Sequence, residues 1–194
     1  MVRKTGLLIV VSLCTLISLA QENKRSITDY GRRFYYNNEE GITPSYISYF
    51  GKSFPQQDLQ TITGKTIARG FLKNKVVVYN FWFIKCQPCI AEIPALNKLY
   101  DRYQSDSLEF IAITFDDSTT IQKFLEKKEF NFSIVSLDQG TISKMKKMSY
   151  YPMTFIVNRN QEISYAFFGK VDGKNPDEGL FSLLEAKLIQ AFKE

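Results

Sequence analysis

The pattern of hydrophobic and polar positions predicts alternating strands and helices over most of the chain. An apolar, β-branched run at 76–82 predicts a buried strand, and apolar residues at helical spacing predict a helix from Pro88 to about Gln104. Residues before this strand, at 61–67, alternate around Gly64 as a hairpin would. Later patterns predict, in chain order, a strand at 108–114, a helix at 118–128, a strand at 132–137, a helix at 142–148, strands at 153–157 and 163–169 and a helix at 176–192. This order indicates an α/β fold with a central mixed β-sheet flanked by helices.

The N-terminal residues do not share this alternation. Arg3 and Lys4 precede an apolar run that ends at Ser18-Leu19-Ala20, which has small residues three positions and one position before a cut after Ala20. This arrangement is typical of a secretory signal peptide. We therefore predict a signal peptide at residues 1–20, a polar and aromatic N-terminal arm at 21–45 and one globular domain at 46–194.

Two other interpretations of the N-terminus stay open. The apolar run could be retained as a membrane anchor, although it is short for a typical span. Cys14 could be the acylated cysteine of a lipoprotein, but Leu13 fits poorly before such a cysteine and the apolar run continues past it. Cleavage after Ala20 would place the mature protein in the periplasm or another extracytoplasmic compartment, with Cys86 and Cys89 as its only cysteines.

Composition limits the size of the fold and the class of partner. The chain has 194 residues, which allows one domain with a substantial core. Its formal net charge is +5, and its lysines are spread over several predicted elements without a basic stripe, so we expect no nucleic-acid partner. With three cysteines and no histidine, the chain offers neither a disulfide framework nor a full set of zinc ligands.

The sequence Cys86-Gln87-Pro88-Cys89 joins the predicted strand at 76–82 to the helix that follows it. A dithiol at a helix N-terminus meets unpaired backbone N–H groups and the positive end of the helix dipole, and both favour a thiolate. We therefore predict a redox site in which Cys86 is the attacking sulfur and Cys89 is the resolving one. A zinc site would need two further Cys or His ligands, whereas a purely structural disulfide is not distinguished by spacing alone.

The residues around this pair resemble the thioredoxin superfamily and, within it, the exported TlpA/ResA-like thiol-disulfide oxidoreductases. The resemblance covers roughly residues 46–192. Its most specific part is the pattern F-W-x-x-x-C-x-P-C-x-x-E-x-P, which is met by Phe81, Trp82, Cys86, Pro88, Cys89, Glu92 and Pro94. It implies a thioredoxin-like fold with an N-terminal extension, and exchange of the Cys86/Cys89 dithiol or disulfide with client proteins.

The resemblance also implies a direction and a set of partners. The direction is reductive, keeping client cysteines such as those of apocytochromes reduced in an oxidising compartment. The implied partners are client proteins with thiols or disulfides and an upstream thiol-disulfide electron donor in the membrane. No cofactor and no metal is implied beside the cysteine pair.

Two further residues gain a catalytic role from the resemblance. Pro152, at the start of a predicted strand, occupies the place of a cis-proline that faces the dithiol, whereas the sequence alone would favour an ordinary trans proline. Glu92 stands where the TlpA-like branch carries a carboxylate for proton exchange with the resolving thiol. Its alternative role is that of an acid in the first helical turn, which would only complement the dipole. Asn80 departs from the family, because many thioredoxins carry a titratable Asp at this position.

The candidate residues for client binding are Trp82, Tyr151 and Pro152. Tyr151 directly precedes the proline and would touch an incoming protein backbone, although aromatic packing would also explain it. Trp82 is also assigned to the core and to the wall behind the disulfide. Lys85 could favour the thiolate of Cys86, with a solvated surface lysine as the alternative.

Two other classes of protein share this fold. A peroxiredoxin-like peroxidase would carry its nucleophile in P-x-x-x-T-x-x-C, and the residues before Cys86 offer neither the proline nor the threonine. A metal-binding chaperone module would need C-x-x-x-C with a distant histidine, whereas this chain has C-x-x-C and no histidine. The sequence therefore favours an exported thiol-disulfide oxidoreductase over both.

Overall fold

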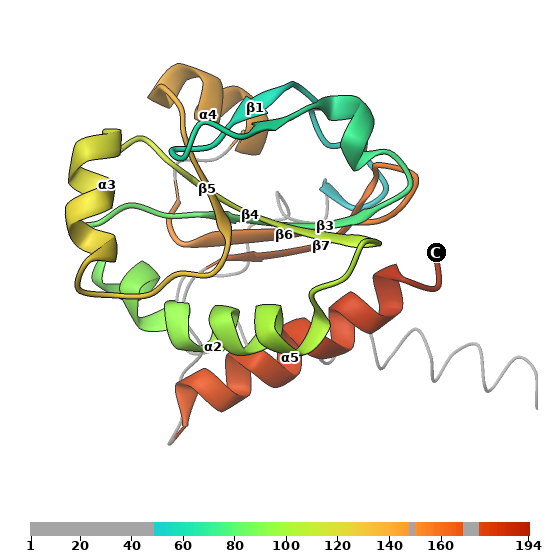
Figure 1. The fold of residues 1–194 in the computed structure, drawn as a ribbon. Helices are drawn as coiled ribbons and strands as arrows, with labels where there is room; N and C mark the ends of the chain where they lie inside the picture. The colour runs from blue at the N-terminus through green and yellow to red at the C-terminus, as the bar shows by residue number, and fades with distance from the viewer. Residues whose placement is uncertain (1–48, 148–149, 169–174) are drawn as a thin grey trace, which may run out of the picture. The chain divides into compact units, whose positions relative to one another are not determined.

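The computed structural model describes residues 49–147, 150–168 and 175–194, which all belong to one compact unit of the chain at 44–194 (Figure 1). The predicted signal peptide at 1–20 and the arm at 21–45, with Cys14, lie outside the described residues. Within the described part, none of the helices has the length and apolar content of a membrane span. The domain boundaries drawn from the sequence therefore stay predictions.

A five-stranded mixed sheet forms the centre of the domain (Figure 1). Its strands lie in the order β5-β4-β3-β6-β7, in which β3, β4 and β5 run parallel, β6 runs antiparallel to β3, and β7 runs antiparallel to β6. The bounds are Val76–Phe81 for β3, Leu108–Thr114 for β4, Ser133–Ser136 for β5, Met153–Val157 for β6 and Ile163–Phe168 for β7. Every residue of β3 is buried, as expected for the central strand of a sheet that is covered on both faces.

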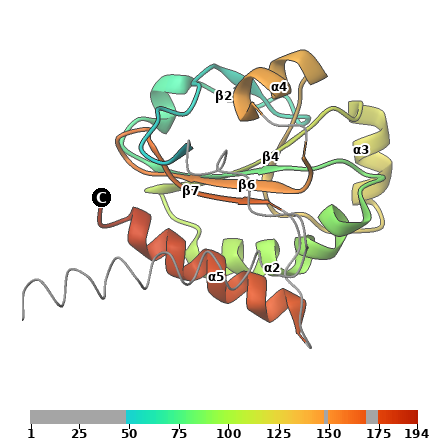
Figure 2. The ribbon, with the colours of Figure 1, turned by 180° about the vertical axis from the view of Figure 1, so that it is seen from behind.

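Helices cover both faces of this sheet, as the sequence predicted. α2 (Gln87–Tyr103) and α5 (Pro176–Ala191) lie along one face, and α4 (Gln139–Lys146) lies on the other (Figures 1 and 2). α3 (Ser118–Leu125) connects β4 to β5, and a short 3₁₀ helix, η2 (Arg69–Leu72), precedes β3. The chain therefore forms the α/β layers that its order of elements indicated.

The hairpin expected around Gly64 is also present, on the same face as α4. β1 (Leu59–Gln60) pairs antiparallel with β2 (Thr66–Ile67), and Gly64 supplies the positive φ of 85° in the turn between them. The side chains of Leu59 and Ile67 are buried, so the hairpin closes the core on its side of the sheet.

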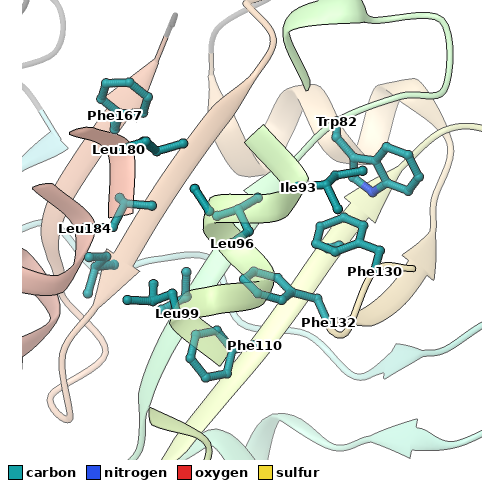
Figure 3. Packing of buried hydrophobic residues seen from close by; sticks show 14 of the residues in the cluster. Trp82, Ile93, Leu96, Leu99, Phe110, Phe130, Phe132, Phe167, Leu180 and Leu184 are labelled. Atoms are coloured by element: carbon teal, nitrogen blue, oxygen red, sulfur yellow. The ribbon is translucent and has the colours of Figure 1, made fainter. Parts of the chain in front are cut away.

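Two hydrophobic cores lie on the two faces of the sheet. The first fills the space between the sheet and the helices α2 and α5. It contains Leu96 and Leu99 of α2 and Leu184 of α5 (Figure 3). Both cysteines of the C-x-x-C motif belong to this first core. The second core, on the side of α4 and the hairpin, contains Tyr49 and Phe155, whose ring centroids are 5.4 Å apart.

One helix begins earlier than the apolar pattern predicted. The helix expected at 142–148 starts at Gln139, because the side chain of Asp138 caps it by accepting the N–H of Thr141 at 2.9 Å. Apolar spacing locates the buried face of a helix, whereas a polar cap decides where the helix begins. The prediction was therefore wrong by one turn at this end.

One other helix end differs from the sequence-based expectation, whereas the last helix begins where it was predicted. The helix predicted at 118–128 ends at Leu125, where the polar residues that follow no longer contribute to a buried face. The last helix begins at Pro176 as predicted, but the side chain of Asn175 makes no capping hydrogen bond. The proline, whose fixed φ suits the first helical position, is the signal that located this end correctly.

Candidate active site

The C-x-x-C motif lies at the junction of β3 and α2, as the sequence predicted. Cys86 is the N-cap residue of α2, and its Sγ accepts the backbone N–H of Cys89 at 3.2 Å. The two cysteines form a disulfide, with their Cα atoms 5.2 Å apart. The first sulfur therefore uses one of the N–H groups that a helix N-terminus leaves unpaired, which is the arrangement that favours a thiolate after reduction.

Exposure differs little between the two cysteines. The exposed fraction is 6% for Cys86 and 2% for Cys89, so both are buried in the disulfide form. The residues around them, Lys85, Gln87 and Pro88, are exposed.

The loop that carries Cys86 is held by Asp116, which the sequence analysis did not identify. One oxygen of the Asp116 carboxylate accepts the backbone N–H of Ile84 at 2.8 Å and the hydroxyl of Thr114 at 2.9 Å. The N–H of Cys86 donates to the carbonyl of Phe83 at 3.1 Å and tightens the same loop. The available signal was position: Asp116 follows the carboxyl end of β4, which is the parallel neighbour of the strand that leads to the motif.

Glu92 is a buried carboxylic acid on α2. Its exposed fraction is 5%, and neither carboxylate oxygen has a hydrogen-bond partner among the described residues. Burial disfavours the charged form and holds the pKa of Glu92 well above its usual value. Because α2 begins at Gln87, Glu92 lies beyond the first turn, so the alternative of a first-turn acid does not fit its position.

Asn80 occupies the middle of the sheet and makes a neutral hydrogen bond. Its Nδ2 donates to Oγ1 of Thr154 at 3.0 Å, and both side chains are buried. The two residues face each other across the β3–β6 pair. The amide of Asn80 does not titrate, so this residue cannot exchange a proton with the thiols. Glu92 is the buried carboxylic acid of α2.

Pro152 lies beside the start of the motif loop. The peptide bond between Tyr151 and Pro152 is cis, as the resemblance implied and as the sequence alone did not favour. Met153, the next residue, pairs with Phe81 at the end of β3. The register of the sheet thus brings Pro152 next to the point where the chain leaves β3 toward Cys86.

Tyr151 is half-buried and packs against the motif loop. Its ring centroid lies 5.2 Å from that of Phe83 and 5.9 Å from that of Phe115. Burial, and to a smaller extent the charge of Asp116, raises the pKa of Tyr151, so its hydroxyl is neutral at ordinary pH. The neighbouring Tyr150 is largely exposed.

Trp82 belongs to the core rather than to the surface. It is 1% exposed, and its ring lies 5.4 Å from that of Phe124 and 5.3 Å from that of Phe130 (Figure 3). This burial agrees with the assignment of Trp82 to the wall behind the pair. It leaves almost no surface for the direct client contact that was also expected of it.

Within 49–147, 150–168 and 175–194, no three His, Cys, Asp or Glu residues lie close enough together to hold a metal ion.

Two comparisons of sequence identify the relatives of this chain. The model of the AhpC/TSA family matches residues 50–166, which is more than half of the chain. Thiol-disulfide oxidoreductase ResA of a Bacillus cereus strain is 30% identical over 122 residues, which cover 62% of this chain and 70% of the relative. Thioredoxin-like protein YneN of Bacillus subtilis (strain 168) is 29% identical over 134 residues, which cover 67% and 78%.

Solved structures support the fold. StoA from Bacillus subtilis superposes with a TM-score of 0.55 at 23% identity, and the match covers 70% of this chain and 98% of StoA. The thioredoxin domain of a thiol-disulfide oxidoreductase from Bacteroides vulgatus has a TM-score of 0.59 at 19% identity and covers 72% and 97%. The fold is thus thioredoxin-like, and the peroxidase and metal-chaperone alternatives are not favoured. The chain belongs to the AhpC/TSA family, as a thioredoxin-like thiol-disulfide oxidoreductase.

Proposed function

We propose that this enzyme is an exported protein-disulfide reductase whose reacting groups are Cys86, Cys89 and Glu92. The observation that carries the proposal is the position of Cys86 as the N-cap of α2, where its Sγ accepts the N–H of Cys89. The helix dipole and this hydrogen bond stabilise a thiolate at Cys86, whereas Cys89 lies inside the helix. A purely structural disulfide would need no such difference between its two sulfurs.

The proposed reaction consists of two thiol-disulfide exchanges. The Cys86 thiolate attacks one sulfur of a client disulfide, so that a Cys86–client bond forms, the client bond breaks, and the departing client sulfur takes up a proton. The Cys89 thiolate then attacks the Cys86 sulfur, the Cys86–Cys89 bond forms, and the second client sulfur leaves and is protonated. The client gains two electrons and two protons, and the enzyme pair is oxidised.

Glu92 is proposed to exchange the proton of the resolving thiol. Cys89 and Glu92 are three residues apart on α2 and therefore lie on one side of the helix. A carboxyl group with a raised pKa can accept a proton and give it back near neutral pH. Neither carboxylate oxygen has a hydrogen-bond partner within the described chain, so burial alone raises the pKa of this acid.

Tyr151 and Pro152 are proposed as the client-binding edge of the site. Pro152 lies beside the end of β3, and Tyr151 packs on Phe83 in the loop that carries Cys86. A client backbone that approaches Cys86 would pass along these two residues. Trp82 is buried in the same hydrophobic core as the two cysteines, so it is proposed to line the wall behind the pair.

The reductive direction, the place of action and the partners are also proposals. They are supported by the relatives named ResA and by the sequence at 1–20, which resembles a secretory signal. In an oxidising compartment a reductase needs a supply of electrons, so an upstream thiol-disulfide donor in the membrane is part of the proposal. Clients are then proteins with paired cysteines, such as apocytochromes.

A trapping experiment tests the mechanism. Cys89→Ala should accumulate mixed disulfides with client proteins on non-reducing gels, because it blocks only the second exchange, while Cys86→Ala should accumulate almost none. In the reduced protein, iodoacetamide should modify Cys86 first, with an apparent pKa below the free-thiol value of about 8.5. If both variants trap clients equally, the pair is structural and the proposal fails.

Equilibration against glutathione tests the direction. A reductase should have a potential near the reducing end of the range for this fold, about −270 mV, rather than near about −120 mV. The mature protein should also accelerate the reduction of insulin disulfides by dithiothreitol. A potential near about −120 mV would be compatible with the exchange mechanism, but the enzyme would then oxidise its clients and the proposed direction would be wrong.

A further inference from the structure

Lys146, the last residue of α4, is a lysine buried inside the domain. Its exposed fraction is 1%, although lysine is among the residue types that proteins bury least. Its Nζ donates to the carbonyl oxygen of Tyr150 at 2.7 Å and lies 3.4 Å from the centre of the Tyr151 ring. Neither of the two ion pairs found among the described residues involves Lys146.

Burying the ammonium group of Lys146 costs free energy, so packing alone does not explain its position. Burial of a charge without a carboxylate disfavours the charged form, and it lowers the pKa of Lys146 to about 8. A methionine of similar length would fill the same space without that cost. The two groups that offset the cost, a carbonyl oxygen and an aromatic face, both belong to the two residues before Pro152.

The contacts of Lys146 connect the proline loop to the loop that carries the nucleophile. The Tyr151 ring contacts the ammonium and also packs edge-on against Phe83, at 5.2 Å and an interplanar angle of 90°. Phe83 in turn accepts the N–H of Cys86 through its carbonyl. The backbone of Lys146 is fixed as well, because its carbonyl accepts the hydroxyl of Tyr49 at 2.5 Å.

We propose that Lys146 is a positioning residue for client binding: its ammonium group holds Tyr150 and Tyr151 so that the loop before Pro152 faces the cysteine pair in one conformation. This inference rests on the proposed function, in which that loop receives the client. Lys146 itself does not touch the reacting sulfurs. Its effect is on the binding of clients that extend along the loop, and small disulfides that need no such surface are unaffected.

The test compares Lys146→Met with Lys144→Met, a matched control that removes the same charge from an exposed position of α4. Insulin is the protein substrate, with dithiothreitol as the electron source, and hydroxyethyl disulfide is the small substrate. Lys146→Met should raise KM for insulin by about tenfold, from the loss of one charge-assisted hydrogen bond and one buried cation–π contact. Its kcat for insulin and its rate with hydroxyethyl disulfide should stay within about twofold of the wild type. Lys144→Met should match the wild type in KM for insulin, in kcat for insulin and in the rate with hydroxyethyl disulfide.

A second variant keeps the test decisive if Lys146→Met folds poorly. Lys146→Gln retains a donor for the Tyr150 carbonyl but removes the cation over the Tyr151 ring, so it should raise KM by about threefold. An unchanged KM for insulin in both variants would overturn the inference, and so would an equal loss of rate with hydroxyethyl disulfide. A wild-type enzyme that fails to reduce insulin would instead refute the proposed function.

Discussion

Glu92 and Lys146 are both buried ionisable side chains, but they lie on opposite faces of the sheet and have different surroundings. Glu92, on α2, has no hydrogen-bond partner for either carboxylate oxygen within the described part of the chain. Lys146, on α4, has a carbonyl oxygen and an aromatic ring around its ammonium group. Burial raises the pKa of the first and lowers the pKa of the second to about 8. The carboxyl group of Glu92 is therefore suited to exchanging a proton. The ammonium group of Lys146, which has partners, is suited to fixing the conformation of the loop before Pro152.

The largest expected effect is that of Glu92→Gln on the rate of exchange. The variant should reduce a client disulfide about a hundredfold more slowly near neutral pH, because positioned acid–base groups typically contribute that much or more. Its pH–rate profile should also be flatter, since glutamine does not titrate. Stopped-flow measurement with the pre-reduced enzyme across the neutral range checks both expectations.

Glu126→Gln is the matched control for this experiment. Glu126 is exposed at the end of α3, outside the site, so the same chemical change should leave the rate unaltered. A Glu92→Gln enzyme with the wild-type pH profile would remove the distinction between the two buried groups, and Glu92 would then be a tolerated core residue.

The sequence was sufficient to predict Glu92 and insufficient to predict Lys146. Glu92 belongs to a contiguous pattern with the cysteines, so a local motif located this residue beside them. Lys144, Lys146 and Lys147 are alike in sequence, and only Lys146 is buried. Which of them turns inward depends on how α4 sits on the sheet, and that follows from the Asp138 cap and from contacts with residues far away in the chain, such as Tyr49.

The same limit applies to the rest of the site and to the fold. The strands and the junction of β3 with α2 could be predicted, because their apolar runs and the cysteine spacing are local signals. Asp116 could not, because its bond to Ile84 spans 32 residues and depends on the pairing of β3 with β4. Asn80 and Thr154 likewise meet only when β6 pairs with β3. Contacts that the sheet register creates are not visible in the spacing along the chain.

The second prediction concerns how the ionisation of Glu92 makes the stability of the fold depend on pH. The folded protein binds this proton more tightly than the unfolded chain, so ionisation opposes folding, and stability falls as the pH rises above the unfolded value of about 4.5. Relative to the wild type, Glu92→Gln should therefore gain stability as the pH rises above this value, with a slope of at most about 1.4 kcal/mol per pH unit. Urea unfolding of the disulfide form at several pH values measures the difference, and a constant difference would contradict the raised pKa.

The third prediction is the opposite trend at Lys146. Its folded-state pKa of about 8 lies below the ordinary lysine value, so the unfolded chain binds more protons above pH 8 and the wild type gains stability there. Relative to Lys146→Met, the wild type should gain up to about 1.4 kcal/mol between about pH 8 and 9. The same unfolding experiment applies, with Lys144→Met as the control that should show no trend. A trend of equal size in Lys144→Met would show that the effect comes from net charge and not from burial.

The smallest expected effect on the reaction is at Asp116, which contacts the motif loop and acts on Tyr151 through its charge. Asp116→Asn keeps an oxygen that can accept the N–H of Ile84 but removes the negative charge, so the pKa of Tyr151 should fall slightly toward its ordinary value while insulin reduction stays within about twofold. Asp116→Ala also removes the hydrogen bond, and a hydrogen bond to a charged group contributes about 1.5–3 kcal/mol to stability. This variant should therefore have a lower thermal stability, and Cys86 should attack a few fold more slowly. Tyrosine titration by NMR and iodoacetamide kinetics measure the two effects separately. Asp116→Asn could instead slow the attack by Cys86 as much as Asp116→Ala does. In that case the charge of Asp116, and not its hydrogen bond to the loop, would control the reactivity of Cys86. Asp116 would then not act by positioning the loop, as we propose for Lys146.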